Sequence, residues 1–382
     1  MTATVPSPGP SGRGGTTLVP GTRPFGVYVH VPFCRHRCDY CAFATYTDRD
    51  HLMVRYVDAC LAELAAARRQ GELPLATSVF FGGGTPSRLP AGEIARLLDA
   101  VPRAAGCEVT VECNPEDADS GRLSHYRQAG VTRMSFGLQS TEAHVLASLG
   151  RRHRAGALDR AAAAVAAAGF ATWNVDLVFG AVGETEDDWE RTLDRVLDLD
   201  APPPHVSAYA LTVEPGTPLA AAPARHPDDD VQAARYERAD ARLSEAGYRW
   251  EEVSNWSLPG HGCRHNRLYW EQGDYRGIGS AAHSHRDGHR WWNVRTPDRY
   301  VAAIEAGTSA VAGDEHLTPE QRRFEALALS LRTPAGVPGD ALPASADLEG
   351  LVDHAGGRAV LTRQGRLLAN DLTTRLVVPG RP

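Results

Sequence analysis

The sequence has no run of about 18 consecutive apolar residues, the length that a membrane-spanning helix needs. Its N-terminal region also lacks the apolar core of a secretory signal peptide. We therefore expect no transmembrane segment and a cytoplasmic location. A basic excess is missing as well, since 40 Lys and Arg residues face 47 Asp and Glu residues, a formal net charge of −7 at pH 7. This balance argues against a nucleic-acid partner, which usually requires a basic stripe.

A disulfide framework is not expected, because the 382-residue chain has an odd number of cysteines, 7, and no secretion signal. A reducing compartment fits this composition better. Four of these cysteines are isolated in the sequence, and we expect them to be small buried side chains. They are Cys60, Cys107, Cys113 and Cys263.

The other three cysteines, Cys34, Cys38 and Cys41, directly follow a short β-type run and Pro32. Thiolates at this spacing can converge on one soft metal centre: zinc, copper(I) or an iron–sulfur cluster. A four-iron cube held by three cysteines would keep one iron open for a small molecule. The spacing also suits one face of a buried helix, but the charged residues between the cysteines argue against that interpretation. A structural zinc site usually takes a fourth protein ligand.

The Cys-x3-Cys-x2-Cys spacing resembles the cluster motif of the radical S-adenosylmethionine (SAM) enzymes. The longer string Tyr28-Val-His-Val-Pro-Phe-Cys34 resembles one branch of them, which contains the oxygen-independent coproporphyrinogen III oxidases and the radical SAM heme chaperones. The resemblance covers roughly residues 25–376. It implies a [4Fe–4S] cluster held by Cys34, Cys38 and Cys41, with SAM bound to the open iron.

Strands and helices alternate from residue 25 onward, which predicts a parallel sheet, open or rolled. Such barrels carry their active sites at the carboxyl ends of the strands. The resemblance implies an α/β fold, a partial (β/α)6 radical SAM barrel with a small, mostly helical, winged-helix-like C-terminal domain. We expect strands at 26–31, 78–81, 108–112, 133–136, 171–179 and 205–211. The expected units are a disordered tail at 1–24, the barrel core at 25–215, a barrel extension at 216–316 and the C-terminal domain at 317–382.

A glycine-rich segment, Gly82 to Pro86, directly follows the second expected strand. Glycines allow close approach of a ligand, and successive N–H groups form an anion-binding nest. The segment is not a phosphate-binding P-loop, because no Gly-Lys-Ser/Thr follows it. Its position one strand after the cysteine motif is where the family contacts the methionine part of SAM.

Several polar residues lie near the ends of successive expected strands. Each alone would more often be a surface or structural group. A carboxylate can accept hydrogen bonds from ribose hydroxyls, and an arginine can pair with the methionine carboxylate. The resemblance implies that SAM is held by Tyr28, Gly83, Gly84, Thr85, Glu112, Gln139, Arg151, Asp176 and the backbone near Ala210.

The string His261-x-Cys263-x-His265 could be a zinc or heme ligand set, or a polar corner beside aromatic residues. Its continuation, His265-Asn266-x-x-Tyr269-Trp270, resembles a signature of the heme-chaperone branch. The resemblance implies that His265 binds heme, since histidine is a common axial ligand of heme iron. Two later histidines, His285 and His289, are expected to be exposed to solvent.

Two departures from the coproporphyrinogen oxidases favour the heme chaperones. Phe43 stands where those oxidases carry a further cysteine, and the N-terminal segment is of low complexity. The resemblance thus implies binding of heme and its delivery to acceptor heme proteins, including those of the respiratory chain, with no catalytic residue assigned. The alternatives are an oxygen-independent coproporphyrinogen III oxidase and, from another class, a zinc-binding winged-helix regulator.

Overall fold

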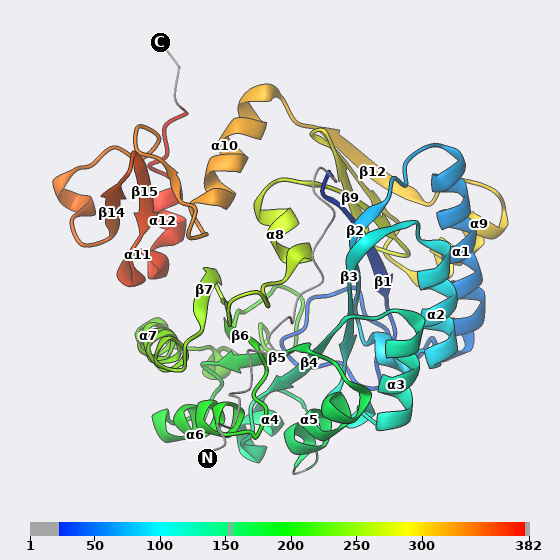
Figure 1. Ribbon diagram of the computed structural model, residues 1–382, viewed down its shortest axis with the longest axis horizontal. Coiled ribbons are helices and arrows are strands. Elements are labelled where there is room, and N and C mark those ends of the chain that lie inside the picture. The colour runs from blue at the N-terminus through cyan, green and yellow to red at the C-terminus, as the bar shows by residue number, and fades with distance from the viewer. Residues whose placement is uncertain (1–22, 152–153, 155, 379–382) are drawn as a thin grey trace, which may run out of the picture.

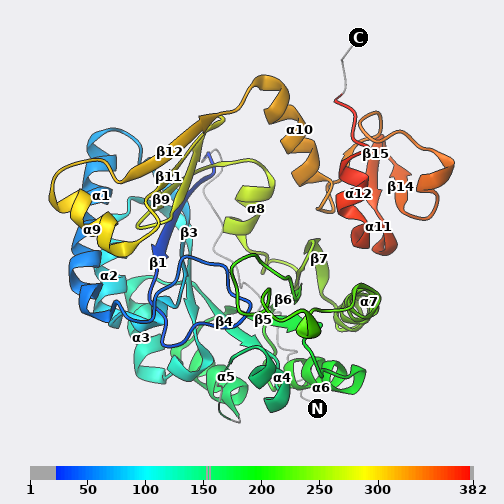
Figure 2. The same ribbon diagram turned by 180° about the vertical axis from the view of Figure 1, so that it is seen from behind.

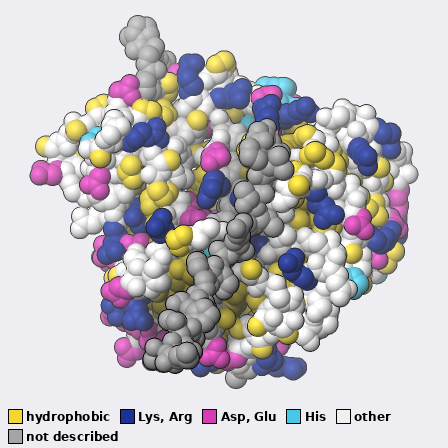
Figure 3. All heavy atoms as spheres, in the orientation of Figure 1, with side chains coloured by type: hydrophobic (Ala, Val, Ile, Leu, Met, Phe, Trp, Pro, Cys, Tyr) yellow, Lys and Arg dark blue, Asp and Glu magenta, His cyan; other side chains and the backbone are white. Residues whose placement is uncertain are grey.

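The structure is a computed structural model that describes residues 23–151, 154 and 156–378. The disordered tail expected at 1–24 lies almost wholly outside these residues. The body of the described chain is a twelve-stranded sheet, and a separate three-stranded sheet lies near the C-terminus (Figure 1). Basic and acidic side chains are interspersed over the face shown in Figure 3.

Six consecutive parallel strands form the centre of the large sheet, in the order β1-β2-β3-β4-β5-β6. Their bounds are β1 Phe25–Val31, β2 Ala76–Gly83, β3 Arg103–Cys113, β4 Arg133–Gln139, β5 Thr172–Phe179 and β6 His205–Ala210. All six expected strands are present. This rolled, open sheet with sequential parallel strands is the partial (β/α)6 barrel that the resemblance implied.

Helices cover the outer face of the six strands, as Figures 1 and 2 show from opposite sides. They are α1 Met53–Arg69, α2 Ala91–Ala100, α3 Ser120–Ala129, α4 Ala143–Ser148, α5 Ala157–Ala168 and α6 Glu186–Leu197. Short 3-10 helices occur at Asp50–Leu52, Pro86–Arg88, Pro115–Asp117, Pro223–Arg225 and Ala346–Leu348.

The alternation of side chains along each strand separates an apolar outer face from a polar interior. In β1, Val27, Val29 and Val31 are fully buried in the core shared with the helices, whereas Tyr28 and His30 point to the other face. Polar residues occupy equivalent positions on the other strands: Ser78, Glu108, Thr110, Glu112, Ser135, Asn174, Asp176, His205 and Ser207. Burial of the apolar outer face against the helices stabilises the fold. The polar side chains of the interior are available to bind ligands.

The segment expected as a barrel extension adds strands at both edges of the same sheet. Beside β6 lie β8 Asn255–Ser257 and β7 Arg249–Glu252, which follow α7 Asp229–Glu245. Beside β1 lies β9 Asp274–Ile278, parallel to it, followed by an antiparallel run. That run consists of β10 His283–Arg286, β11 His289–Asn293 and β12 Val311–His316, with α9 Pro297–Glu305 before its last strand. Helix α8, Arg264–Trp270, connects the two edges.

The C-terminal unit has a hydrophobic core of its own, formed by side chains between Leu331 and Leu376. It follows α10 Pro319–Ser330 and contains β13 Val337–Pro338, β14 Val352–Ala355, β15 Arg358–Leu361, α11 Arg363–Leu367 and α12 Ala369–Thr373. Asp240 on α7 forms ion pairs with Arg363 and Arg366, and these join the unit to the barrel.

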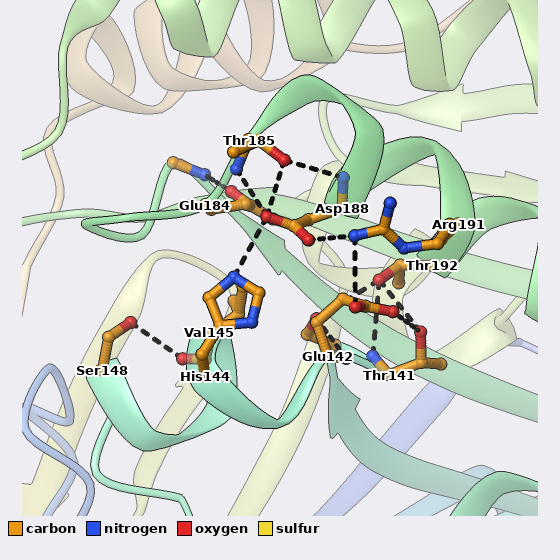
Figure 4. Close-up of polar contacts among 12 residues, drawn as sticks. Thr141, Glu142, His144, Val145, Ser148, Glu184, Thr185, Asp188, Arg191 and Thr192 are labelled. Atoms are coloured by element: carbon orange, nitrogen blue, oxygen red, sulfur yellow. Dashed lines mark hydrogen bonds and ion pairs between the residues drawn. The ribbon is translucent and has the colours of Figure 1, made fainter.

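A polar network ties α4 to α6 on the outside of the barrel (Figure 4). Thr185 caps α6, and the side chain of Asp188 completes a capping box with it. Asp188 also contacts His144, at 3.0 Å, and Arg191, which in turn pairs with Glu142 at 3.3 Å. Burial alone would raise the pKa of Asp188. Its hydrogen bonds with Thr185 and His144 outweigh burial and lower the pKa to about 2. The network is a brace between two helices rather than part of the barrel interior.

Candidate functional site

The three motif cysteines lie on a loop that leaves the carboxyl end of β1. Backbone hydrogen bonds close the base of the loop: Cys34 N donates to Tyr46 O at 3.0 Å, and Tyr46 N donates to Pro32 O at 2.7 Å. Cys34, Cys38 and Cys41 are free thiols of intermediate exposure. The loop therefore presents its cysteines at the barrel mouth from a fixed base.

The surroundings of the loop act in two directions on its cysteine thiols. Burial raises the pKa of the Cys34 and Cys38 thiols, and neighbouring cysteine thiols add to the effect. Arg151 acts in the opposite direction on both. Metal binding displaces thiol protons, because the thiolate is the ligand. Cys34 and Cys38 interact with Arg151 and with Cys41, and three such thiol donors fit a cluster ligated at three irons.

The glycine segment is shaped by close packing against the end of β1, where this loop begins. Gly83 has φ +111°, and a Cβ there would lie 2.4 Å from the ring of His30. A Cβ on Gly84 would lie 2.8 Å from Val31 O. The expected anion nest is not formed, because these N–H groups already have acceptors within the protein. Gly83 N donates to Glu112 Oε2 at 3.2 Å, Gly84 N to Val31 O at 2.8 Å and Thr85 N to Phe33 O at 2.9 Å.

Two carboxyl groups, Glu112 and Asp176, face the barrel interior and keep partial access from it. Burial, and next the nearby Asp176, raise the pKa of Glu112 to about 8. Burial also raises the pKa of Asp176, which accepts hydrogen bonds from Asn174 at 2.8 Å and Ser135 at 3.3 Å. In the described part of the chain, neither carboxyl group has an arginine within salt-bridge distance. The pair is suited to hydroxyl groups or to a cationic ligand, and SAM offers both.

Arg151 and Gln139 meet above the end of β4. A Cβ on Gly137 would lie 3.0 Å from Gln139 Nε2 and 3.4 Å from Arg151 Nη2. Arg151 donates to Tyr40 OH at 3.2 Å, and its buried Nε has no hydrogen-bond partner among the described residues. Gln139 adopts φ +69°, a strained conformation that is common at functional sites. The free Nε is a donor suited to a ligand carboxylate.

Most of the residues assigned to SAM from the sequence are thus gathered at one end of the barrel. Tyr28 joins them through its hydroxyl, 3.1 Å from His30 Nδ1. Ala210 ends β6 and pairs with Phe179, and no contact joins it to the others within the described structure. Sequence reasoning missed two residues of the site. His30 contacts the cysteine loop at Ala44 O, and Tyr40 OH accepts a hydrogen bond from Arg151. The available signal was a polar residue, His30, between two buried valines.

The His265 segment occupies the opposite end of the barrel interior. His265 is 1% exposed, with Nδ1 2.9 Å from Ser78 Oγ and Nε2 2.9 Å from Tyr269 OH. Its ring stacks on Phe80, and burial lowers its pKa to about 3. Both ring nitrogens are therefore engaged within the protein. Its assignment to heme stays a prediction.

The three side chains of the His-x-Cys-x-His string contact three different strands. His261 contacts Thr172 on β5, at 2.9 Å, and Cys263 contacts Glu108 on β3, at 3.7 Å. Because His265 contacts β2, the three do not converge on one ion. The alternative of a polar corner therefore describes this string better than a zinc ligand set.

The expectation for His285 is wrong. His285 is 3% exposed, with Nδ1 2.9 Å from Gly273 O, and Gly288 N donates to its Nε2. The ring braces the β10–β11 turn, which the sequence pattern did not reveal. His289 is partly exposed, with 37% of its side chain accessible. The four isolated cysteines are buried and free, as expected.

Comparisons with known proteins found a matching family model, similar sequences and a similar fold. The Radical SAM superfamily model matches residues 28–196. "Heme chaperone HemW" of Mycobacterium tuberculosis is 43% identical over 95% of this chain and 97% of its own length. "Heme chaperone HemW" of Bacillus subtilis is 31% identical over 90% of this chain and 97% of its own.

Among solved structures, coproporphyrinogen III oxidase (HemN) of Escherichia coli matches with a TM-score of 0.80. It covers 92% of this chain and 89% of its own, at 22% identity, which shows a shared fold. None of the helices in the described ranges has the length and apolar character needed to cross a membrane. Radical SAM membership implies a [4Fe–4S] cluster and SAM as cofactors. The relatives' identity over nearly the whole chain shows that this protein belongs to the HemW family of the radical SAM superfamily.

Proposed function

We propose that this protein binds heme and delivers it to acceptor heme proteins, those of the respiratory chain included, in the cytoplasm. The observation that carries the proposal is the 43% identity to a relative named a heme chaperone, over 95% of the chain. In this proposal heme is the cargo, and the [4Fe–4S] cluster and SAM are resident cofactors.

The cofactor site follows from the contacts at the barrel mouth. Cys34, Cys38 and Cys41 would hold the cluster, and Arg151 lies beside them with a free donor. SAM would lie toward the unpaired carboxyl groups of Glu112 and Asp176. When bound, the cluster supplies an open iron for SAM, while this chain's residues position the ligand and shield it from solvent.

The test of delivery is a transfer assay. The anaerobically reconstituted protein is loaded with one equivalent of heme and mixed with the apo form of a b-type heme protein. We expect the Soret spectrum to change to that of the acceptor, with a rate that rises with acceptor concentration. Transfer no faster than spontaneous release into a passive heme scavenger would contradict the proposal.

The alternative, oxidative decarboxylation of coproporphyrinogen III, is separated by a product assay. Phe43 is 68% exposed beside the cysteine loop, so this position offers a large apolar side chain where the oxidases carry a thiol. We expect no protoporphyrinogen IX to form from coproporphyrinogen III in the presence of SAM and a reductant. Turnover would favour the oxidase. Zinc without iron or sulfide after anaerobic purification would instead favour the zinc-binding alternative.

A further inference from the structure

A large cavity lies at the end of the barrel opposite the cysteine loop. Its volume is about 1540 Å³, and it lies among the amino-terminal ends of β3, β4 and β5, strand β7, helix α8 and the C-terminal unit. Figures 1 and 2 both show α8 between the barrel strands and α10. The volume exceeds the roughly 300–1,000 Å³ of common small-molecule pockets. A ligand as large as a tetrapyrrole therefore has room here.

Helix α8 divides the His-Asn-x-x-Tyr-Trp segment between two environments. The side chains of His265 and Tyr269 are hydrogen-bonded to each other within the barrel. Asn266 and Trp270 line the cavity, together with the preceding His261. A ligand in the cavity would thus meet His261 directly, whereas His265 is closed off by its own hydrogen bonds.

His261 is held in an orientation suited to metal coordination. Its Nδ1 lies 2.9 Å from Thr172 Oγ1, and its carbonyl accepts a hydrogen bond from Arg133 at 2.9 Å. No partner of Nε2 is found within residues 23–151, 154 and 156–378. If Nδ1 carries the proton toward Thr172, the lone pair of Nε2 is free, which is the arrangement of many metal-binding histidines. Burial, followed by Arg133, lowers the pKa of His261 and so favours the neutral ring.

Arginines, glutamates and two tryptophans are also part of the lining. No ion pair is described for Arg249, and the nearest carboxylate to Arg267 is Glu251, at 4.0 Å. Glu251 itself accepts a hydrogen bond from Ser257 at 2.6 Å. Guanidinium groups bind carboxylates in bidentate geometry, and aromatic rings can pack against a planar macrocycle. Trp250 and Trp270 both line the cavity.

We propose that heme binds in this cavity, with Nε2 of His261 as an axial ligand of its iron and Arg249 and Arg267 beside its propionates. The inference rests on the proposed function, since it locates the cargo. It separates the heme site from the cluster, which lies at the other end of the barrel. It also assigns the iron ligand to His261 instead of His265.

The test compares heme with iron-free protoporphyrin IX on the full-length, cluster-loaded protein. His261→Ala should weaken ferric heme binding at least tenfold and change the Soret and electron paramagnetic resonance spectra, because the iron loses its histidine nitrogen. The same variant should bind protoporphyrin IX as wild type does, because that ligand has no iron. Arg249→Gln/Arg267→Gln should weaken both ligands severalfold. His354→Ala, at an exposed histidine of the C-terminal unit, is the matched control.

Added imidazole, at a concentration too low to coordinate free heme, distinguishes a lost ligand from a misfolded variant, because it should return the heme spectrum of His261→Ala to that of the wild type. Failure of imidazole to do so would count against His261 as the ligand. An unchanged heme spectrum and affinity in His261→Ala, with tight binding by wild type, would overturn this inference and leave the proposed function standing. No heme binding by wild type would overturn the proposed function itself.

Discussion

Gly83→Ala tests how the glycine segment supports the cysteine loop. The new Cβ would lie 2.4 Å from two ring atoms of His30, and the backbone is held at φ +111°. The His30 ring is 3.0 Å from Ala44 O on the cysteine loop, so displacing the ring disturbs that loop. The positive φ costs about 1–2 kcal/mol. Forcing extra volume into a packed interior adds about 1–3 kcal/mol. We therefore expect a loss of about 2–5 kcal/mol in unfolding free energy.

Gly71→Ala is the matched control, because Gly71 has φ +73° but no atom within 4 Å of its added Cβ. It should show only the backbone cost of about 1–2 kcal/mol. The difference between the two variants, about 1–3 kcal/mol, isolates the contact with His30.

A double-mutant cycle then identifies the partner. In a His30→Ala background the clashing ring is gone, so Gly83→Ala should cost about as much as Gly71→Ala. The assay is urea unfolding of the reduced apo-protein followed by tryptophan fluorescence, which avoids any contribution from cluster loss. An equal cost of Gly83→Ala in both backgrounds would refute the packing argument.

Three further predictions concern the cofactor site and the C-terminal unit. Cys38→Ala should abolish the visible absorption of the cluster after reconstitution, whereas Cys60→Ala should retain it; full iron and sulfide in the first variant would remove Cys38 from the ligand set. The pKa of Glu112, raised to about 8, means that the folded apo-protein keeps a proton that the unfolded chain releases, so stability should fall as pH rises from about 4.5 towards 8. Glu112→Gln should flatten this dependence in thermal unfolding at several pH values and weaken SAM binding in calorimetry; unchanged behaviour in both assays would contradict the assignment. Asp240→Asn should lower the unfolding free energy by about 1–3 kcal/mol, because Arg366 and the indole of Trp256 lose a charged acceptor. The variant should also be cleaved faster by protease between the barrel and the C-terminal unit. An unchanged cleavage rate would argue against this anchoring role.

The positions of the six barrel strands and their parallel arrangement were predictable because strand-like and helical segments alternate along the sequence, and the resemblance implied the barrel. The edge strands were harder to predict. β8, for instance, is the three-residue segment Asn255–Ser257, too short for a period-two pattern. Helix α4 was missed for a similar reason, since Ala143–Ser148 spans six residues.

The candidate site was predictable where its motif is local. The three cysteines form one short motif and the glycines form another. The resemblance then assigned the polar residues at the strand ends to the site. Contacts between distant segments could not be predicted, such as Gly83 against His30 or His261 against Thr172. The nest interpretation was wrong because the Glu112 carboxylate accepts from Gly83 N, and the carbonyls of Val31 and Phe33 accept from Gly84 N and Thr85 N. His285 was wrong because its acceptor, Gly273 O, lies on another segment.

The central claim is that this member of the HemW family carries heme alongside its cluster. Its most direct test is a heme titration of the anaerobically reconstituted protein, followed at the Soret band with the cluster content measured in parallel. The account predicts saturation at one heme per chain, with cluster absorption retained throughout. A linear, non-saturating rise, equal to that of a protein without a heme site, would contradict it.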